Sequence, residues 1–388
     1  MVDKVCVVTG TRAEYGIIRN VLSGLRNREQ LQLVVTAMHL VPHFGDTIAE
    51  IEADGFRIDA RVPLLLANDD RCGVAKSVGL GVIGFADVFD SLAPDLLLIV
   101  GDRFEMLAAA QTALLMGIPI AHVHGGEVTE GAIYDQIRHA ISKMANVHFV
   151  SNRVYGERLI QMGESPESVH VTGAPGLDNL KQAALMGRSE LERSLNTEFK
   201  ERLFLLTYHP VTRPSSDVDD DLSFLFSALD RFPNASLVWT YPNADMHYKG
   251  ILEQLQSYHL KNSDRMILVE SLGWHRYLSC LSQCDVTIGN SSSGIIEAPA
   301  LRTPSVNIGD RQKGRVLASS VIQVEPEEDA VIDAIDLALT EDFKEVCMAE
   351  VSPFGDGYAS AAILDVLEKL DVSALRRKAF HDLAVEGE

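Results

Sequence analysis

Residues that can transfer protons or bind anions are concentrated in one stretch of the chain, residues 101–139. This stretch carries Asp102, Arg103, Glu105, His122, His124, Glu127, Asp135, Arg138 and His139. Carboxylates and neutral imidazoles act as general acids and bases, and guanidinium groups stabilise developing negative charge. A structural purpose explains one or two such residues between apolar segments, but not all of them. The stretch therefore predicts an active site that combines proton transfer with anion binding.

Two apolar segments position these side chains. Residues 95–100 and 118–122 are short apolar runs, which predict buried strands joined by a helix. Open α/β sheets hold their ligands at the carboxyl ends of the strands, where Asp102 and His124 follow. Because His122 and His124 alternate along the chain, they point to opposite faces of the strand end, and we expect only His124 to face the site.

The same alternation of strands and helices continues along the chain and indicates parallel sheets with helices on both faces. The predicted strands are residues 5–8, 31–37, 56–62, 95–100, 118–122, 147–150, 169–171, 203–207, 236–240, 266–269, 286–288, 305–308 and about 320–324. The predicted helices are residues 15–28, 44–54, 73–91, 104–116, 133–145, 152–162, 217–231, 245–259, 274–283, 294–301, 326–339 and 358–370. We predict an α/β protein of two Rossmann-like, doubly wound domains, residues 1–180 and 181–355, with a ligand cleft between them.

The first strand-to-helix turn has the sequence Thr9-Gly-Thr-Arg12-Ala-Glu. Gly10 allows a ligand to approach the backbone closely, and the helix amides that follow can receive an anion. A dinucleotide-binding fingerprint needs a second glycine where Arg12 stands, so a nicotinamide or flavin cofactor is disfavoured and no cofactor is expected. Arg12 fits either a surface ion pair or a ligand contact.

A second turn, Gly289-Asn-Ser291-Ser292-Ser-Gly-Ile-Ile-Glu297, follows a predicted strand and opens a helix. Hydroxyl groups and free amides at a positive helix terminus suit a diphosphate, and Glu297 can accept two hydrogen bonds from a ribose diol. The alternative is a serine N-cap, formed by Ser292 or its neighbour, followed by a glutamate that compensates the helix dipole. Arg311, after the next strand, can supply positive charge.

Two more histidines follow predicted strands. His209, in Tyr-His-Pro, can bind a phosphate or transfer a proton near neutral pH, or it can be a packed structural residue. His39, in Met-His-Leu, lies in the same kind of position. No His-Glu-x-x-His or comparable spacing supports a metal site, and none is expected.

The composition sets limits on the partners. A chain of 388 residues is too long for one typical core, and a formal net charge of −21 argues against nucleic acid or an anionic membrane as partner. Five cysteines without a Cys-x-x-Cys pair predict buried free thiols in a reducing compartment. The amino-terminal segment does not resemble a signal peptide, and the best membrane candidate, residues 106–121, is interrupted by Gln111 and Pro119. We expect a cytoplasmic protein.

Several blocks together resemble the UDP-hydrolysing N-acetylglucosamine 2-epimerases of sialic-acid-type sugar biosynthesis. The blocks are TGTRAEYG, AMHL, GDRFE, HVHGGEVTEGA, IRHAISK, YHPVT, GNSSSGIIEA and NIGDRQKGR, in this order between about residues 5 and 325. The resemblance implies the GT-B architecture, in which residues 356–388 cross back onto the first domain. It also implies a UDP-sugar as partner, a homodimer, and a reaction in which UDP leaves, a glycal forms, and water adds with inversion at C2.

The resemblance also implies roles for individual residues. The phosphates are assigned to Arg12, Arg103, His209, Ser291 and Ser292, the ribose to Glu297 and Arg311, and the uracil to Asn243 and Tyr277. Asp102 is the main acid/base carboxylate, with Glu127, Asp135 and His209 as further candidates for proton transfer. Arg138 and His39 line the sugar pocket.

Two positions depart from the acidic pattern of better-known members. His124 stands where many relatives have glutamate, and Tyr134 stands where they have a carboxylate. Either Glu127 and Asp135 take over proton transfer, or His124 is the base, or the sugar differs. The His-x-His-Gly-Gly-Glu form resembles relatives that act on UDP-2,4-diacetamido-trideoxyhexoses on the legionaminic-acid route, so both this sugar and N-acetylglucosamine stay open. A non-hydrolysing 2-epimerase, a GT-B glycosyltransferase and a non-catalytic UDP-sugar sensor are the alternatives.

Overall fold

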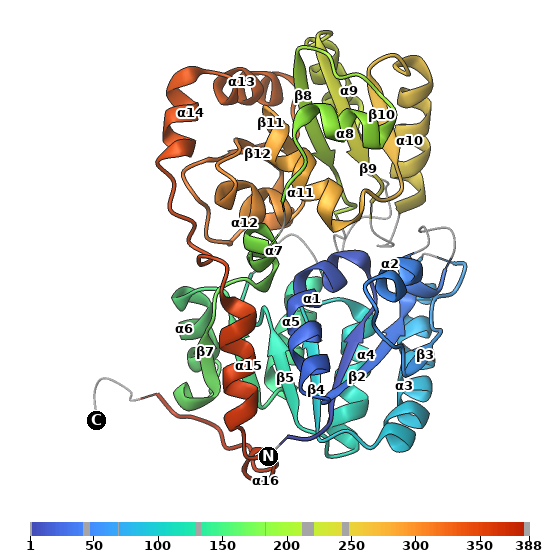
Figure 1. Cartoon of the computed structure of the whole chain (residues 1–388), viewed down its shortest axis with the longest axis vertical. Helices are drawn as coiled ribbons and strands as arrows, with labels where there is room; N and C mark the ends of the chain where they lie inside the picture. Colours follow the sequence, from blue (N-terminus) through green and yellow to red (C-terminus); the bar gives the residue numbers. More distant parts are fainter. Residues whose placement is uncertain are drawn as a thin grey trace. The chain divides into compact units, whose positions relative to one another are not determined.

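The computed structural model of the chain describes residues 2–41, 47–68, 70–128, 133–182, 184–211, 221–242 and 248–383. The chain divides into two compact units (Figure 1). Unit 1 comprises Met1–Glu127, Tyr134–Lys181 and Phe354–Glu388, and unit 2 comprises Val128–Ile133 and Gln182–Pro353. Each unit is built on one parallel sheet, which confirms the predicted α/β class.

Unit 1 is organised around a sheet whose described strands follow the order β3-β2-β1-β4-β5-β6-β7. The strands are β1 (Val5–Thr9), β2 (Leu31–Thr36), β3 (Ala60–Val62), β4 (Leu96–Val100), β5 (Ile120–Val123), β6 (Val147–Val150) and β7 (Val169–Val171). They pair in parallel, with Val5 beside both Leu31 and Leu96. The strand order reverses between β1 and β4, and such a switch point is where open sheets hold ligands.

Alternate residues of each strand point to the two faces of this sheet, and both faces are buried. Val5 and Val7 lie in the same apolar cluster as helices α1 and α15, whereas Cys6 and Val8 lie with α3, α4 and α5. The helices of unit 1 are α1 (Arg12–Asn27), α2 (Thr47–Ala53), α3 (Arg71–Leu92), α4 (Phe104–Leu115), α5 (Tyr134–Met144), α6 (Arg153–Gln161), α7 (Asp178–Gln182), α15 (Ala359–Lys369) and α16 (Val372–Leu375). Short 3₁₀ helices are η1 (Ala37–Leu40), η3 (Pro166–Ser168) and η4 (Pro175–Leu177).

The carboxyl-terminal helices complete unit 1. Ile363 and Leu367 of α15 lie in the same core cluster as α1. A Cβ atom on Gly24 of α1 would come within 2.1 Å of Leu364, so the two helices meet at this glycine. Arg28 Nη1 donates a hydrogen bond to the carbonyl oxygen of Leu364 at 3.0 Å. The last segment of the chain is therefore an integral layer of this unit.

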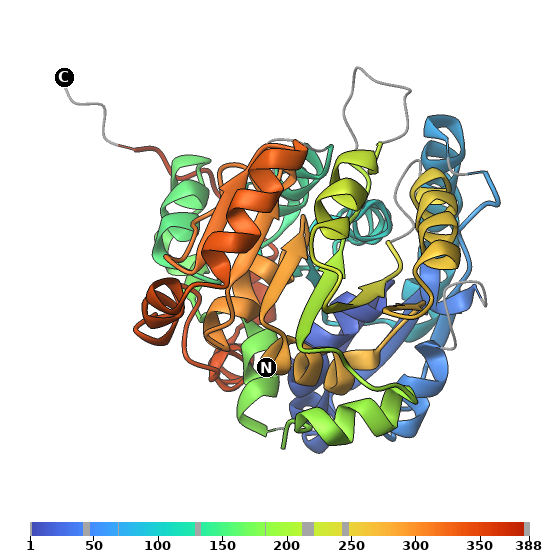
Figure 2. The same cartoon turned by 90° about the horizontal axis from the view of Figure 1, so that it is seen from above.

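Unit 2 contains a sheet whose described strands follow the order β10-β9-β8-β11-β12-β13, again in parallel. The strands are β8 (Arg202–Thr207), β9 (Ala235–Thr240), β10 (Met266–Val269), β11 (Val286–Gly289), β12 (Ser305–Ile308) and β13 (Val321–Val324). The helices are α8 (Arg188–Leu195), α9 (Ser223–Asp230), α10 (Tyr248–Lys261), α11 (Gly273–Gln283), α12 (Ser293–Ala300), α13 (Glu328–Ala338) and α14 (Glu341–Met348), with the 3₁₀ helix η5 (Asp310–Gln312). Helices α9 and α13 pack side by side, and with α10 they share one apolar cluster with the strands (Figure 2).

Three local expectations were wrong. The strand predicted over residues 56–62 begins only at Ala60, because residues 56–59 approach the sheet without joining its ladder. Helix α14 was not predicted from its short, acidic sequence. Cys72 is exposed on α3 rather than buried, although the other four cysteines are buried and all five are free.

Helix α3 also corrects the expectation that no segment is apolar enough to cross a membrane. Among the described residues α3 is the one helix that is long and apolar enough to cross a membrane by length and composition alone. Lys76 and Asp87 interrupt its apolar run, so the sequence does not show it as a continuous apolar segment. In the fold its inner face packs on the sheet through Phe85 and Phe89.

Candidate functional site

The candidate site residues of unit 1 follow β1, β4 and β5. These strands are neighbours in the sheet, so the turns after them lie along one sheet edge. Gly101 turns the chain after β4 with φ +74°, and His124 turns it after β5 with φ +63°. A positive φ is unusual for a residue with a side chain and marks a locally strained backbone. Asp102 is thereby placed beside the switch point between β1 and β4, and His124 is placed after the adjoining strand β5.

His124 and Glu127 form a buried pair. Nδ1 of His124 lies 2.6 Å from Oε1 of Glu127, and the same carboxylate oxygen accepts a hydrogen bond from Ser151 Oγ at 3.1 Å. All three side chains are buried. A carboxylate that accepts from Nδ1–H fixes the tautomer in which Nε2 carries the lone pair. The arrangement makes Nε2 of His124 competent as a general base.

Arg138 of α5 joins this pair to Asp102. Its Nη1 atom donates to the carbonyl oxygen of His124 at 2.7 Å and lies 3.7 Å from Glu127 Oε2, and its Nη2 atom donates to Asp102 Oδ2. Burial alone would lower the pKa of Arg138, but the adjacent carboxylates of Asp102 and Glu127 raise it. One permanently charged guanidinium therefore positions both predicted proton-transfer groups.

Arg103 is held by a second buried network. It is the N-cap residue of α4, and its Nε atom donates to Glu105 Oε1 at 2.7 Å. The Glu105 side chain passes so close to Gly10 that a Cβ atom there would lie 2.8 Å from it. Because Gly10 has no side chain, the turn after β1 packs directly against Glu105, which follows the turn after β4. Glu105 was noted in the sequence but not assigned a role, and the structure identifies it as the residue that orients Arg103.

The turn after β1 also sets the position of Arg12, the first residue of α1. Thr11 Oγ1 accepts from the amide of Glu14 at 3.2 Å, and Glu14 Oε2 accepts from the amides of Thr11 and Gly10 at 3.0 and 2.8 Å. This reciprocal capping box ends the turn and starts the helix. Burial and the nearby charge of Glu105 raise the pKa of Glu14 to about 8.

His39 and His122 are fixed by two hydrogen bonds each. The ring nitrogens of His39 lie 3.1 and 2.8 Å from the hydroxyls of Thr9 and Thr47, and burial lowers its pKa to about 4. His122 lies 3.0 Å from Ser142 Oγ and 2.7 Å from the carbonyl oxygen of Gly101, and burial lowers its pKa to about 3. Both rings are therefore neutral at pH 7, and both support the turns that carry the other residues.

The start of α5 carries the second departure from the acidic pattern. Tyr134 is buried at the first position of the helix, and Asp135 follows it with partial exposure. Asp135 Oδ2 lies 3.7 Å from Nε2 of His139, one turn further along. The helix therefore presents the Asp135 carboxylate beside the His139 imidazole, and His139 directly follows the buried Arg138.

The candidate site residues of unit 2 are organised by Asn290, a fully buried residue that was not predicted from the sequence. Its side chain accepts from the amide of His209 at 2.7 Å and donates to the carbonyl oxygen of His209 at 2.8 Å. Its own carbonyl oxygen accepts from Arg311 Nη1 at 3.1 Å and from Gln312 Nε2 at 2.8 Å. Asn290 thus joins the turns after β8, β11 and β12, and an asparagine directly after a strand-ending glycine was the available signal.

The serines after β11 fit a ligand site better than a plain helix cap. Ser292 is the N-cap residue of α12, but in the described structure its side chain makes no capping hydrogen bond. Ser291 Oγ accepts from the Ser293 amide at 3.4 Å. Ser291, Ser292 and Glu297 are all partly exposed, so solvent or a ligand can reach them.

Tyr277 of α11 lies close to this helix start. Burial raises its pKa to about 12, and hydrogen bonding with Ser293 and Thr207 partly offsets the rise. Asn243, the other residue assigned to the uracil, lies outside the described residues. Among described residues no group of three or more His, Cys, Asp or Glu side chains could hold a metal ion.

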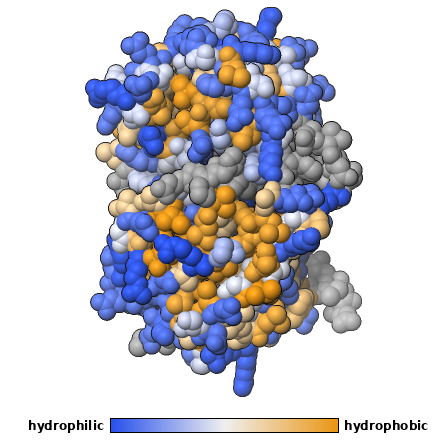
Figure 3. All heavy atoms as spheres, turned by 90° about the vertical axis from the view of Figure 1, so that its right-hand side faces the viewer, coloured by the Kyte–Doolittle hydropathy of each residue, from blue (hydrophilic) through white to orange (hydrophobic). Residues whose placement is uncertain are grey.

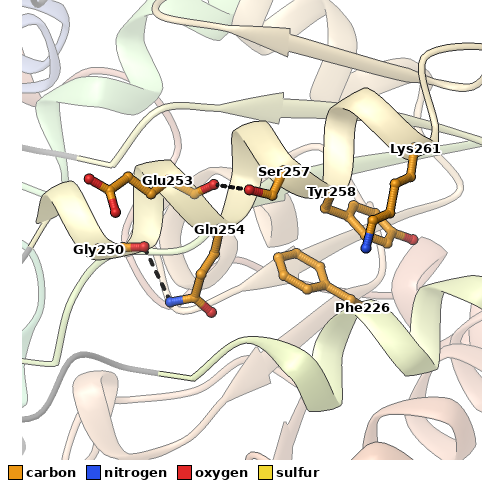
Figure 4. Close-up of a pocket in the computed structure, with 7 residues that line it drawn as sticks. All are labelled: Phe226, Gly250, Glu253, Gln254, Ser257, Tyr258 and Lys261. Atoms are coloured by element: carbon orange, nitrogen blue, oxygen red, sulfur yellow. Dashed lines mark hydrogen bonds between the residues drawn. The ribbon is translucent and has the colours of Figure 1, made fainter.

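One pocket lies apart from all of these residues. It is lined by Phe226 and by one face of α10, including Gln254, Ser257 and Tyr258 (Figure 4). Two of the polar side chains drawn there bond back to the α10 backbone, Gln254 to Gly250 and Ser257 to Glu253. None of the residues expected at the active site lines this pocket.

Comparison with known proteins shows to which family the chain belongs. A family model described as UDP-N-acetylglucosamine 2-epimerase matches residues 24–368. The chain belongs to the UDP-N-acetylglucosamine 2-epimerase family. This 2-epimerase is 43% identical over 324 residues to the GDP/UDP-N,N′-diacetylbacillosamine 2-epimerase (hydrolyzing) of Campylobacter jejuni, which covers 83% of this chain and 84% of the relative. It is 37% identical over 372 residues to the UDP-N,N′-diacetylbacillosamine 2-epimerase (hydrolyzing) of Legionella pneumophila, covering 95% and 97% of the two chains.

The 2-epimerase fold is also that of solved structures. A crystal structure of UDP-GlcNAc 2-epimerase from Neisseria meningitidis, bound to UDP-GlcNAc, matches with a TM-score of 0.78 at 20% identity. The match covers 95% of this chain and 100% of that one. The predicted GT-B architecture of two parallel-sheet domains is confirmed by this likeness.

Proposed function

We propose that this 2-epimerase hydrolyses UDP-N,N′-diacetylbacillosamine, a UDP-2,4-diacetamido-trideoxyhexose, to UDP and the free sugar epimerised at C2. The observation that carries the proposal is the identity with the C. jejuni and L. pneumophila proteins, both named as hydrolysing 2-epimerases of nucleotide-linked N,N′-diacetylbacillosamine, the first with GDP or UDP and the second with UDP. UDP-N-acetylglucosamine, giving N-acetylmannosamine, is the second substrate to test. The family description supports it, because it names that sugar nucleotide.

The reaction needs a base that removes the C2 proton and groups that stabilise the negative charge of the departing UDP. The C2 proton passes to a base, the bond between C1 and the UDP oxygen breaks, and a glycal is left. Water then adds its hydroxyl to C1 and a proton reaches C2 from the opposite face. The C2 proton is weakly acidic, so most of the activation comes from stabilising the departing diphosphate.

We assign the C2 base to His124. Glu127, itself held by Ser151, binds the Nδ1 side of the ring, which leaves Nε2 to accept the proton. Asp102, which accepts a hydrogen bond from Nη2 of Arg138, is assigned to proton transfer on the opposite face of the sugar ring. Asp135 is a further candidate for this role. In this chain an imidazole–carboxylate pair thus replaces one of the two carboxylates implied by the family resemblance.

Binding of the UDP leaving group is assigned to cationic side chains and serine hydroxyls. Arg103, oriented by Glu105, is proposed to contact the phosphates together with Arg12, His209, Ser291 and Ser292. Glu297 and Arg311 are assigned to the ribose, and Tyr277 with Asn243 to the uracil. Unit 1 is then the sugar side and unit 2 the nucleotide side.

We further propose that the enzyme is a cytoplasmic homodimer without a cofactor. All five cysteines are free, which fits a reducing compartment.

The decisive experiment incubates the pure protein in deuterated water with each of the two sugar nucleotides in separate reactions. We expect free UDP and a free epimerised sugar carrying deuterium at C2, with the diacetamido nucleotide turned over at least tenfold more efficiently. Release of a UDP-linked epimer would identify a non-hydrolysing enzyme. A strict need for an acceptor would identify a glycosyltransferase, and UDP binding without turnover would identify a sensor. A preference for UDP-N-acetylglucosamine would keep the reaction and overturn the substrate.

A further inference from the structure

The strap, residues 376–383, is the last described segment of the chain and has no helix or strand of its own. Lys378 anchors it to the rest of unit 1. Its Nζ atom donates to the carbonyl oxygens of Lys143 and Ala145 at 2.7 and 2.6 Å, and it lies 2.7 Å from Glu164 Oε2. Because an ammonium group has three donors, each donor of Lys378 has an acceptor here.

The two carbonyl groups lie at the carboxyl end of α5, which ends at Met144. The last carbonyls of a helix have no partner within the helix and carry the negative end of its dipole. Lys378 supplies this end with both hydrogen-bond donors and positive charge. Glu164 extends the contact, because it also binds Lys143 of α5 at 2.8 Å and His148 of β6 at 2.9 Å. The end of α5 is therefore tied both to the strap and to the sheet.

A second anchor of the strap is Phe380. Its ring packs on Gly163, where a Cβ atom would overlap it, and the ring centroid lies 4.6 Å from Nζ of Lys143. The amide of His381 donates to the carbonyl oxygen of Gly163 at 3.0 Å. Both anchors of the strap therefore involve Lys143 of α5.

The strap adds little to the apolar core of unit 1. Phe380 is 63% exposed, and residues 376–380 are all exposed. A pocket of about 250 Å³ is lined by Arg377 and Lys378 together with Glu164, so the strap is not closely packed on the unit. The hydrophobic surface of unit 1 in Figure 3 lies on the side that carries α3, whereas the strap runs on the side of α6 and β7 (Figure 1). The contacts of the strap are directed at α5 rather than at apolar surface.

Helix α5 also holds the turns of the candidate site in unit 1. Arg138 donates to the carbonyl oxygen of His124 and to the carboxylate of Asp102. Ser142 lies 3.0 Å from Nδ1 of His122, whose other ring nitrogen binds the turn before Asp102. The position of α5 along its axis therefore decides where both turns lie.

We propose that the strap positions the active site, with Lys378 as a positioning residue. Lys378 fixes the end of α5, and α5 fixes the turns that carry Asp102 and His124. Arg138 stands five residues before Lys143, which is about 8 Å along the helix. A misplacement of about 1 Å can cost about 10²-fold in rate, so a shift of this helix changes turnover without contact between Lys378 and the sugar. Because the roles of Asp102 and His124 belong to the proposed function, the kinetic test of this proposal rests on it, whereas a test by hydrogen exchange does not.

Lys378→Met in the full chain tests the proposal. We expect kcat to fall about tenfold, while KM and the UDP affinity measured by calorimetry stay within about twofold. Hydrogen–deuterium exchange should become at least about threefold faster in peptides that cover residues 134–144 and the turns after β4 and β5, and should not change in unit 2. Lys378→Arg keeps the charge and the donors and should recover most of the activity. Phe380→Ala removes the second anchor at an exposed side chain and should give a smaller change of the same kind.

Arg265→Met is the matched control. Arg265 also donates to carbonyl oxygens at the end of a helix, those of Leu229 and Phe232 at 3.1 Å, and it pairs with Asp230 at 2.9 Å. Its helix, α9, carries none of the proposed site residues. Arg265→Met should therefore lower the unfolding midpoint but keep kcat within about twofold. Lys369→Met, at an exposed lysine of α15, should change neither quantity.

Rates are measured below the unfolding transition that circular dichroism gives for each variant, so that a loss of folded protein is not mistaken for a slower enzyme. Unchanged kcat in Lys378→Met would overturn the proposal, as would a lower kcat with unchanged exchange in α5. An equal loss of kcat in Arg265→Met would also overturn it, because the effect would then be one of general stability. If wild type turns over neither sugar nucleotide, the proposed function fails. Faster exchange confined to α5 and the two turns would still support the strap as a positioning device, and unchanged exchange would reject it.

Discussion

Nδ1 of His124 lies 2.6 Å from the carboxylate of Glu127, and both side chains are buried in the turn that follows β5. An imidazole held in this way has one nitrogen committed to the carboxylate and one available for chemistry. The pair occupies the place where the family resemblance implies a single glutamate. We therefore expect proton transfer in this chain to depend on the imidazole and its carboxylate partner together, and not on a single carboxylate.

Replacing Glu127 with glutamine tests the pair directly. The amide keeps the size of the side chain but no longer favours the Nδ1–H tautomer or stabilises the charged imidazole. We expect kcat to fall about 10²-fold. UDP affinity measured by calorimetry should stay within about twofold, because the change lies on the proposed sugar side. Ser151→Ala removes only one support of Glu127 and should cost less than Glu127→Gln, so an equal or larger loss would contradict the pairing.

Replacing His124 with glutamate restores the residue type implied at this position by the resemblance. We expect about tenfold lower kcat, because the new carboxylate lies beside Glu127 and like charges disfavour ionisation. His124→Asn is the matched control, since asparagine tolerates the positive φ of +63° but cannot accept the proton. It should lose at least 10²-fold. Equal activity of the asparagine variant and wild type would remove His124 from proton transfer.

Asp102 and Glu297 are expected to separate catalysis from nucleotide binding. Asp102→Asn should reduce kcat at least 10²-fold and leave UDP affinity nearly unchanged. Glu297→Ala should weaken UDP binding by about tenfold through the loss of a hydrogen-bonded carboxylate. Calorimetry with UDP and initial rates under saturating substrate distinguish the two effects. The opposite pattern would show that the two roles are reversed.

Glu14 is expected to make folding less favourable in alkali. Burial and the charge of Glu105 raise its pKa to about 8, so the folded state holds a proton that the unfolded state has lost above about 4.5. Its stabilising effect is complete below pH 4.5 and is lost as the pH rises towards 8. Glu14→Gln keeps an acceptor for the Gly10 and Thr11 amides and removes the titration. Thermal unfolding from about pH 5 to about pH 9 should show a decline in wild type that is flatter in the variant.

Glu164 is expected to act in the opposite direction, in acid. Burial alone would raise its pKa, but hydrogen bonds from His148, Lys143 and Lys378 lower it to about 2. Its contribution is complete above the ordinary value near 4.5 and is lost as the pH falls towards 2. Glu164→Gln removes a buried carboxylate from His148 and from two lysines, Lys143 and Lys378, whose side chains reach solvent, and should cost about 2 kcal/mol at pH 7 in urea unfolding.

The control for Glu164 is Glu341→Gln, which breaks an exposed ion pair with Lys344 and should change the unfolding midpoint little. A similar loss of stability in both variants would show that the burial of Glu164 among its partners adds nothing to its contribution.

The strands were predictable because each is a short apolar run buried on both faces, as in β4 and β8. The polar residues just after them were predictable for the same reason, since a strand end fixes where the next side chain lies. What could not be predicted is which of these residues contact one another. Ser151 meets Glu127 across 24 positions of sequence, and Asn290 meets His209 across 81.

The exact bounds of the strands and the exposure of individual side chains could not be predicted from the sequence either. Residues 56–59 have strand-like composition, but ladder formation depends on a neighbour being in reach, and of residues 56–62 only Ala60–Val62 pair with β2. Cys72 appeared to be one more buried thiol because nothing local shows which side of α3 faces the sheet.

Helix α15 gives unit 1 an unusual order of assembly during synthesis. The strands of this unit leave the ribosome first, yet part of the core beneath α1 is supplied by Ile363 and Leu367, near the end of the chain. The sequence of unit 2 is complete by Pro353. The domain made first is thus the one finished last, and until then Leu22 and Leu25 of α1 lack part of their cover. A chain that stops before about residue 359 would leave that surface open to aggregation and to chaperones.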